Sequence, residues 1–201
     1  MIFSFKKSRF FWLRSNFILL LLTALLLMNK PYWEKDANVM FFMFVFTAEF
    51  FLILLSLVYG FQTEKVILSQ RKRAFNKSNF VHGIIVLIFL SIFFALALGE
   101  HMPFPSSLFY ASILINVIMA VISLIFPSWV IKQYEFSIYE ESNGHINDLL
   151  RYFLFFAWTI NYEVQIVLAR LPFVLQRLLG VIFVAVLLWE LTMIGLIFEN
   201  N

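Results

Sequence analysis

Residues Val39 to Tyr59 read VMFFMFVFTAEFFLILLSLVY, and this stretch decides the class of the fold. Twenty-one residues at about 1.5 Å each form a helix about 31 Å long, which matches the roughly 30 Å hydrocarbon core of a bilayer. Its one ionisable residue, Glu49, stands at the centre. An acidic side chain at that depth costs about 3 kcal/mol on insertion scales, so we expect Glu49 to face protein, water or a partner charge.

The composition of the whole chain agrees with this stretch. Of 201 residues, 62% are hydrophobic and 13% are charged, which is too apolar for a water-soluble globule of this size. We therefore predict an all-α polytopic transmembrane bundle. The chain has no cysteine, which excludes disulfides, thiolate metal sites and cysteine nucleophiles.

The hydrophobic pattern predicts one integral membrane domain over residues 1–201 with five strong spans. A further segment, 151–171, has span length but carries Asn161, Glu163 and Gln165 in its middle, so it either crosses as a sixth span or lies in the interface. Counting Lys and Arg favours the interface and a cytoplasmic N-terminus, because the first residues are basic. The five spans lie at about 12–28, 39–60, 81–98, 108–128 and 178–198.

Two connecting segments carry opposite charge, and both are predicted to be cytoplasmic. The segment 62–79 is the most basic loop, either as a topology signal that contacts anionic lipid or as a docking surface for an acidic partner. The segment 129–150 is predicted as a polar, acidic loop. The candidate docking residues are Lys65, Arg71, Lys72, Arg73 and Lys77 in the basic loop and Glu140, Glu141 and Asp148 in the acidic one.

Four polar residues within the membrane segments are candidates for an ion path: Glu49, Glu190, Glu163 and Asn116. Glu49 and Glu190 both fall near mid-membrane, where they are either structural hydrogen-bond donors, a proton or cation site, or part of a ring in an oligomeric pore. Asn116 shares one helical face with Ser112 and Ser123, a pattern that indicates helix packing or a polar pore lining.

The sequence holds no motif of a known enzyme class, such as HExxH, GxSxG or a phosphate loop, so we expect a non-enzymatic protein without cofactor or metal. The string EESNGH is read as a solvated loop. The spans show no footprint of nucleic-acid binding.

The basic N-terminus KKSRFFWLR, the basic loop SQRKRAFNK and the polar segment YEFSIYEESNGHINDLLR occur in a small cysteine-free multispan chain. In size and layout this resembles KwaA, the family of membrane subunits of the bacterial Kiwa anti-phage defence system. That family is associated with four spans, whereas five strong stretches are counted here. The resemblance implies a homo-oligomeric sensor in the bacterial inner membrane that works with a soluble partner, KwaB, which acts on phage DNA.

Two functions remain as hypotheses from the sequence. The first is a homo-oligomeric membrane sensor or scaffold that recruits a cytoplasmic effector, because oppositely charged elements occur on a chain without catalytic motifs. The second is a small ion or proton channel or transporter that uses the intramembrane glutamates.

Overall fold

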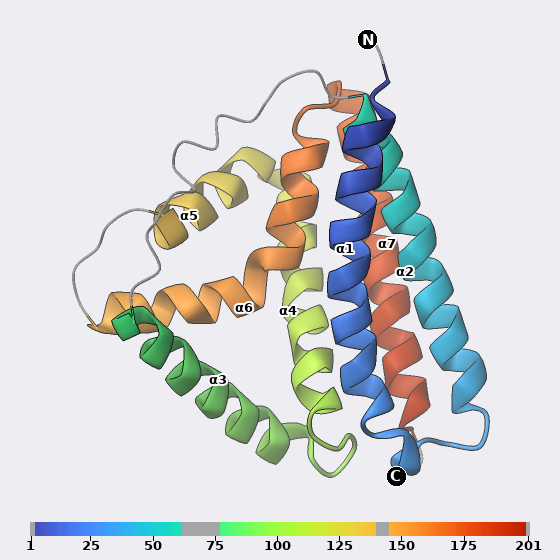
Figure 1. The fold of residues 1–201 in the computed structure, drawn as a ribbon, viewed down its shortest axis with the longest axis vertical. Coiled ribbons are helices and arrows are strands. Elements are labelled where there is room, and N and C mark those ends of the chain that lie inside the picture. Colours follow the sequence, from blue (N-terminus) through green and yellow to red (C-terminus); the bar gives the residue numbers. More distant parts are fainter. Residues whose placement is uncertain (1–2, 62–76, 140–144, 200–201) are drawn as a thin grey trace.

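The computed structural model describes residues 3–61, 77–139 and 145–199, and within these ranges the chain is helical with no strand (Figure 1). Besides one short 3-10 turn, Lys30–Tyr32, seven α-helices are described. They are α1 (Phe5–Leu27), α2 (Ala37–Gly60), α3 (Lys77–Leu98), α4 (Ser106–Ile125), α5 (Pro127–Tyr139), α6 (His145–Leu168) and α7 (Phe173–Ile197).

Five of the described helices, α1, α2, α3, α4 and α7, are long and apolar enough to cross a membrane, which confirms the predicted all-α multispan class. They correspond in order to the five predicted spans. The predicted first span, about 12–28, falls on α1, and this helix begins earlier, at Phe5, so Lys6, Lys7, Arg9 and Arg14 lie within it. The basic residues did not interrupt the helix, because Lys and Arg are good helix formers.

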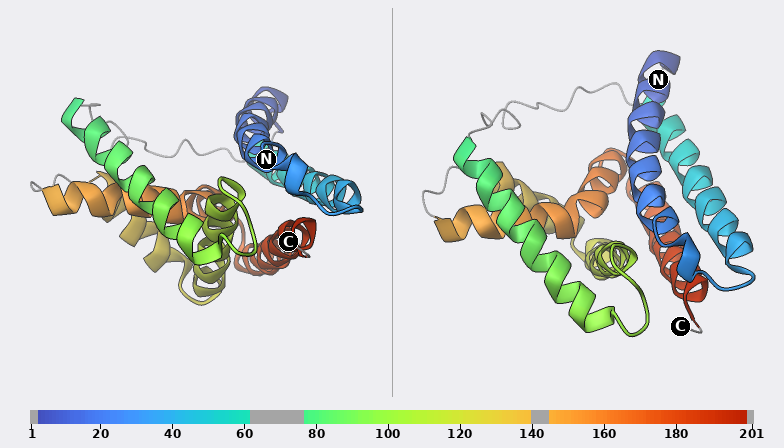
Figure 2. Two further views of the ribbon diagram at one scale, coloured as in Figure 1. Left: turned by 90° about the horizontal axis from the view of Figure 1, so that it is seen from below. Right: turned by 60° about the horizontal axis from the view of Figure 1, so that its bottom comes forward.

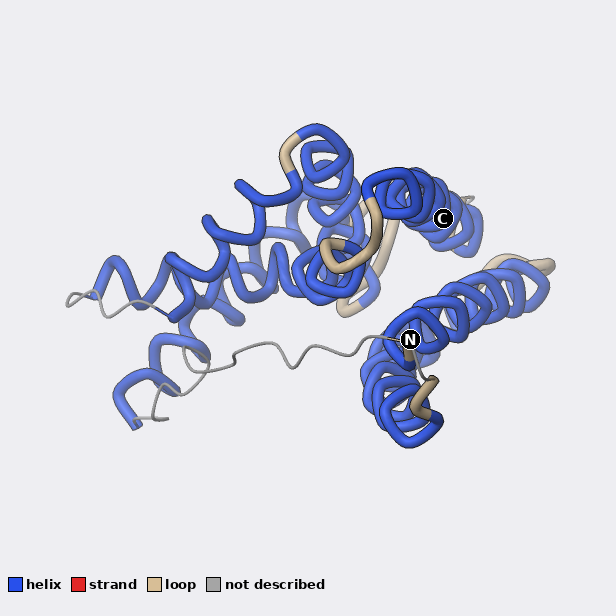
Figure 3. Tube along the Cα trace, turned by 90° about the horizontal axis from the view of Figure 1, so that it is seen from above, coloured by secondary structure: helices blue, strands red, loops and turns tan. Residues whose placement is uncertain are grey.

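The helices pack around α4, which contacts α1, α3, α5, α6 and α7. Helices α1 and α2 form an antiparallel pair, and α2 packs in turn against α7 (Figures 1 and 3). Helix α3 leans away from this group and approaches α4 only near the turn that joins them (Figure 2). The N-terminus and the C-terminus lie at opposite ends of the bundle, as an odd number of crossings requires.

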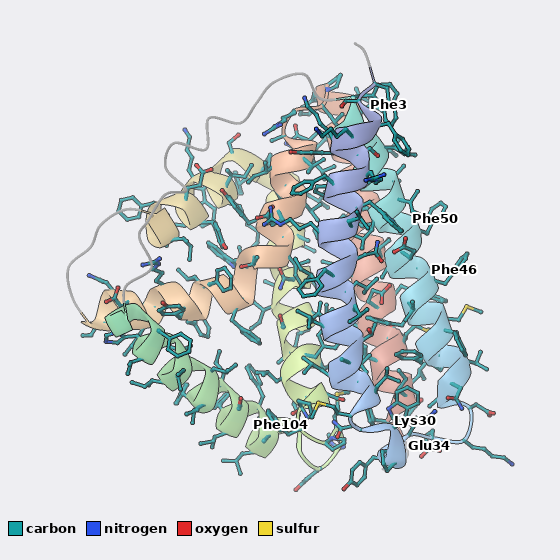
Figure 4. The ribbon with its side chains drawn as sticks, viewed as in Figure 1. Phe3, Lys30, Glu34, Phe46, Phe50 and Phe104 are labelled. Atoms are coloured by element: carbon teal, nitrogen blue, oxygen red, sulfur yellow. The ribbon has the colours of Figure 1, made fainter. Side chains whose placement is uncertain are left out.

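Apolar side chains on α2 divide into an inner and an outer face. Phe46 and Phe50 are 71% and 64% exposed and project outward from the bundle (Figure 4). Phe44 and Phe51 are buried, and Phe51 stacks on Phe183 of α7 with ring centroids 5.4 Å apart. An exposed phenylalanine is unfavourable in water but favourable against acyl chains, so the outer face of α2 suits lipid.

Hydrogen bonds close the end of the bundle that holds the C-terminus. The side-chain amide of Asn29, after α1, donates to Ser106 Oγ at 2.9 Å at the start of α4. The backbone N–H of Glu34 donates to the carbonyl of Ile197 at 3.1 Å. Figure 4 shows Glu34 at this end and Phe3 at the opposite one. The turn between α1 and α2 is therefore tied to both α4 and α7.

The segment 129–150 was wrongly predicted as a loop, and the fourth span ends at Ile125 rather than near 128. Pro127 is the first residue of α5. At this position the missing N–H of proline costs nothing, because the first N–H groups of a helix have no partner within the helix. Tyr134 and Ile138, four residues apart, are buried, and Tyr134 stacks on Tyr162 of α6 at 4.0 Å. The high polar content hid this amphipathic helix, whose apolar face is covered by α6.

The segment 151–171 fits neither predicted arrangement as a whole. Helix α6 is bent: its first half runs across the direction of α1, α2 and α7, and its second half runs alongside α4 (Figure 1). The first half packs against α3, whereas the second half packs against α5 and holds the fully buried Asn161 and Leu168. Its 24 residues do not meet the apolarity of a membrane span.

Candidate functional site

A cavity of about 190 Å³ lies between α1, α2, α4, α6 and α7. Each helix contributes side chains at the spacing of one helical face, as residues 11, 14, 15, 18, 19 and 22 of α1 illustrate. Its wall is almost entirely apolar and includes the rings of Phe11, Phe44, Phe51, Phe109 and Phe183. Three charged residues, Arg14, Glu163 and Glu190, interrupt that wall.

Glu190 of α7 is the most unusual residue of the cavity. Its side chain is only 3% exposed, and among the described residues neither carboxylate oxygen has a hydrogen-bond partner. Helix α7, like α1, begins at the end of the bundle that holds the N-terminus. Of the α7 residues that line the cavity, Glu190 is therefore the farthest from that end. An unsatisfied buried carboxylate is costly, which makes Glu190 the strongest candidate for a ligand contact.

Arg14 and Glu163 bring opposite charges to the same cavity. Arg14 Nη2 lies 3.8 Å from Glu163 Oε1 and joins α1 to α6, with the two side chains 58% and 33% exposed. The sequence predicts Glu163 as a polar residue within a membrane segment and places Arg14 in the basic N-terminus. The pairing could not be read from the sequence, because 149 positions separate the two residues and only the tertiary fold brings their side chains together.

Glu49 lies outside the residues that line the cavity. Its Oε1 accepts a hydrogen bond from the indole N–H of Trp12 at 2.6 Å, within the α1–α2 pair. Nearby, the hydroxyls of Ser8 and Ser56 share a hydrogen bond at 3.1 Å. Glu49 and Glu190 thus do not form a hydrogen-bonded pair with each other.

Asn116 belongs to a hydrogen-bonded contact between α4 and α6. Its Oδ1 accepts from the backbone N–H of Asn161 at 2.9 Å, and Ser123 Oγ accepts from Asn161 Nδ2 at 3.0 Å. Ser112 Oγ donates to the carbonyl of Phe156 at 3.4 Å. Ser112, Asn116 and Ser123 are all buried, so the stripe forms the helix-packing contact that was one of its two predicted roles.

This contact also explains the bend of α6. The Asn116 side chain accepts a hydrogen bond from the backbone N–H of Asn161, and a side chain inserted at the backbone of a helix is a recognised cause of a bend. Thr159 donates its hydroxyl to the carbonyl of Phe155, a pattern that often bends helices. Thr159 also lines the cavity, as do Ile160 and Glu163 just after it in α6. The bend of α6 therefore lies next to the cavity.

The predicted docking residues are only in part described. Lys65, Arg71, Lys72, Arg73, Glu140 and Glu141 lie outside the described residues, and so does the side chain of Lys77. Asp148 is described, half-buried in the first turn of α6. The described residues contain no group of three His, Asp or Glu side chains that could hold a metal ion.

Comparison of the chain with protein-family models, with curated proteins and with solved structures finds no match. The class is therefore defined by the fold and the cavity: a multi-pass helical membrane protein with a charged, mostly apolar cavity inside its bundle.

Proposed function

We propose that this chain is a non-enzymatic membrane sensor subunit that binds a ligand in its cavity and recruits a soluble effector. The observation that carries the proposal is the course of α6. Its second half lines the cavity with Thr159, Ile160 and Glu163 and also packs against α5, and its first half packs against α3. One helix thus links an internal site to a polar part of the chain, as a sensor requires.

The bend of α6 supplies an element that can take two arrangements. It depends on a few hydrogen bonds from Ser112 and Asn116 of α4, close to the cavity wall. A ligand changes a conformational equilibrium only when it interacts differently with the two conformations. A ligand that contacts α6 just beyond the bend meets this requirement.

The partner side of the proposal follows the resemblance to the KwaA family. We propose a homo-oligomer in a bacterial inner membrane that recruits a KwaB-like soluble effector during anti-phage defence. The basic and acidic docking residues around α2, α3, α5 and α6 would supply the contact surface, without direct binding to nucleic acid.

Co-purification with the soluble protein encoded beside this chain tests the proposal. We expect an oligomeric complex from the wild type, and loss of the effector from Asn116→Leu, which releases the bend. Ser91→Ala is the matched control, because Ser91 bonds only within its own helix to the carbonyl of Leu87. Recovery of a lone monomer that protects cells by itself would refute the proposal.

The unpartnered Glu190 also supports a second candidate, a proton or cation channel or transporter. Purified protein in liposomes decides between the two. Flux that is lost in Glu190→Gln while assembly stays intact would favour conduction. The sensor proposal predicts no flux in either protein.

A further inference from the structure

One carboxyl group of the cavity lacks a counter-charge. Arg14 and Glu163 lie 3.8 Å apart, whereas both oxygens of Glu190 are unpartnered among the described residues. Glu190 is also the most deeply buried of the three groups. A cation that binds in the cavity would allow this carboxyl to ionise, because it would supply the missing opposite charge.

We propose that the cavity binds a small lipophilic amine in its protonated form, with the ammonium group against Glu190. Alkylammonium groups such as that of lysine stay charged at pH 7, so the bound amine would neutralise the cavity. Its hydrocarbon part would lie against the apolar wall. The rings of Phe44, Phe109 and Phe183 line the same space and can contribute cation–π attraction.

An inorganic cation fits the cavity poorly. Calcium takes six to eight oxygen ligands and magnesium requires an octahedral set. The cavity lining around Glu190 consists mainly of Phe, Leu, Ile and Val side chains. Among the described residues, no group of three acidic or histidine residues could bind a metal ion. An ammonium group carries three N–H donors, which the two oxygens of Glu190 and the face of an aromatic ring can accept.

The volume sets the size of the ligand. An engineered apolar cavity of about 150 Å³ holds benzene. A cavity of about 190 Å³ is slightly larger, so it accommodates a ring with a short aminomethyl arm. Benzylamine and its fluorinated forms match both the shape and the charge.

This inference rests on the proposed sensor function for its biological sense, but its test does not need an effector. We suggest ¹⁹F NMR titration of the full-length protein in phosphatidylcholine nanodiscs with 4-fluorobenzylamine and, as a neutral probe of equal size, 4-fluorobenzyl alcohol. For the wild type we expect saturable binding with at least about a tenfold preference for the amine, which corresponds to 1.4 kcal/mol. Equal affinity for both probes, or no saturable binding, would overturn the proposal.

Three variants locate the site. Glu190→Gln should bind both probes equally. Glu49→Gln removes a mid-membrane carboxyl that does not line the cavity, so this variant should keep the preference for the amine. Ala48→Phe fills the cavity without changing its charge and should lose both probes. A retained preference in Glu190→Gln, or undiminished binding in Ala48→Phe, would show that the amine binds elsewhere.

Effector recruitment is measured separately, in the absence of amine. Amine binding without recruitment would leave the ligand assignment standing and refute the sensor function. Recruitment of the effector by a protein that shows no amine preference would leave the sensor function standing and refute the ligand assignment.

Discussion

Trp12 and Glu49 form a hydrogen bond that joins the first two helices inside the apolar part of the bundle. The indole Nε1–H donates to Oε1 of the carboxylate at 2.6 Å. This contact satisfies one oxygen of an acidic group within the apolar part of the bundle, while Oε2 has no partner among the described residues.

Trp12→Phe should lower the free energy of unfolding by about 1–3 kcal/mol, because Glu49 loses the donor to its Oε1. Reversible unfolding in mixed detergent micelles would measure this change. Trp129→Phe on α5 is the control, since Trp129 is 53% exposed. Equal stability of the two variants would contradict the role of the Trp12–Glu49 bond.

Asn116→Leu should loosen the bend of α6 and lower stability by about 1–3 kcal/mol, because the backbone N–H of Asn161 loses a buried acceptor. Hydrogen exchange should speed up at the Asn161 amide in particular. Asn16→Leu serves for comparison, since the Asn16 amide bonds only to the carbonyl of Trp12 in its own helix. Unchanged exchange at Asn161 would mean that Asn116 does not hold the bend.

Gly60→Ala and Gly195→Ala should change stability in opposite directions. A Cβ at Gly60 would lie 2.4 Å from the Phe3 ring and 3.0 Å from Ser8 Cβ, so the Phe3 ring must move and the contact with Ser8 becomes tight, at a cost of about 1 kcal/mol. A Cβ at Gly195 meets nothing within 4 Å, and Ala there should add up to about 1 kcal/mol of helix propensity. Thermal unfolding of both variants in the same detergent measures the difference, and a stable Gly60→Ala protein would argue against the close contact.

The Arg14–Glu163 pair should contribute little to stability, because both groups are at least one-third exposed. A double-mutant cycle with Arg14→Gln and Glu163→Gln should give a coupling energy between about 0 and 1 kcal/mol, and high salt should reduce it. Coupling of several kcal/mol would instead indicate a pair shielded from solvent by the membrane.

Glu190→Leu should raise the free energy of unfolding by about 1–3 kcal/mol, since it removes an unsatisfied buried carboxylate and adds apolar contact. Glu199→Leu, at the exposed end of the chain, is the control. A destabilised Glu190→Leu protein would contradict this expectation and show that the buried carboxyl does not lower stability.

Much of the fold follows from local pattern. The five spans were found because about 20 consecutive apolar residues have one reasonable structure in a bilayer, a helix that satisfies its own backbone. The packing role of Ser112, Asn116 and Ser123 was one of two predicted alternatives, since small and amide side chains on one face are typical of close helix contacts. Helix α5 was missed because its polar residues outweigh the three buried ones, Val130, Tyr134 and Ile138.

The candidate site depended far more on long-range packing. Glu190 and Glu163 were singled out as intramembrane charges, but the sequence pointed to no cavity and to no role for Trp12 or Arg14 in holding glutamates. Arg14 and Glu163 lie far apart in the sequence, and no local sequence pattern around either residue indicates that they form a pair.

The sequence by itself determined that this is a multispan helical membrane protein, because hydrophobic length and the cost of unpaired backbone in lipid leave no other class. Only the tertiary structure decided which carboxylate receives a donor: Oε1 of Glu49 does, whereas its Oε2 and both oxygens of Glu190 have no partner among the described residues. Glu49 and Glu190 are the same residue type within the same kind of helix, yet α1 brings an indole N–H to Glu49, while the helices around Glu190 enclose a cavity. That difference arises from side-chain contacts between helices, which no single helix encodes.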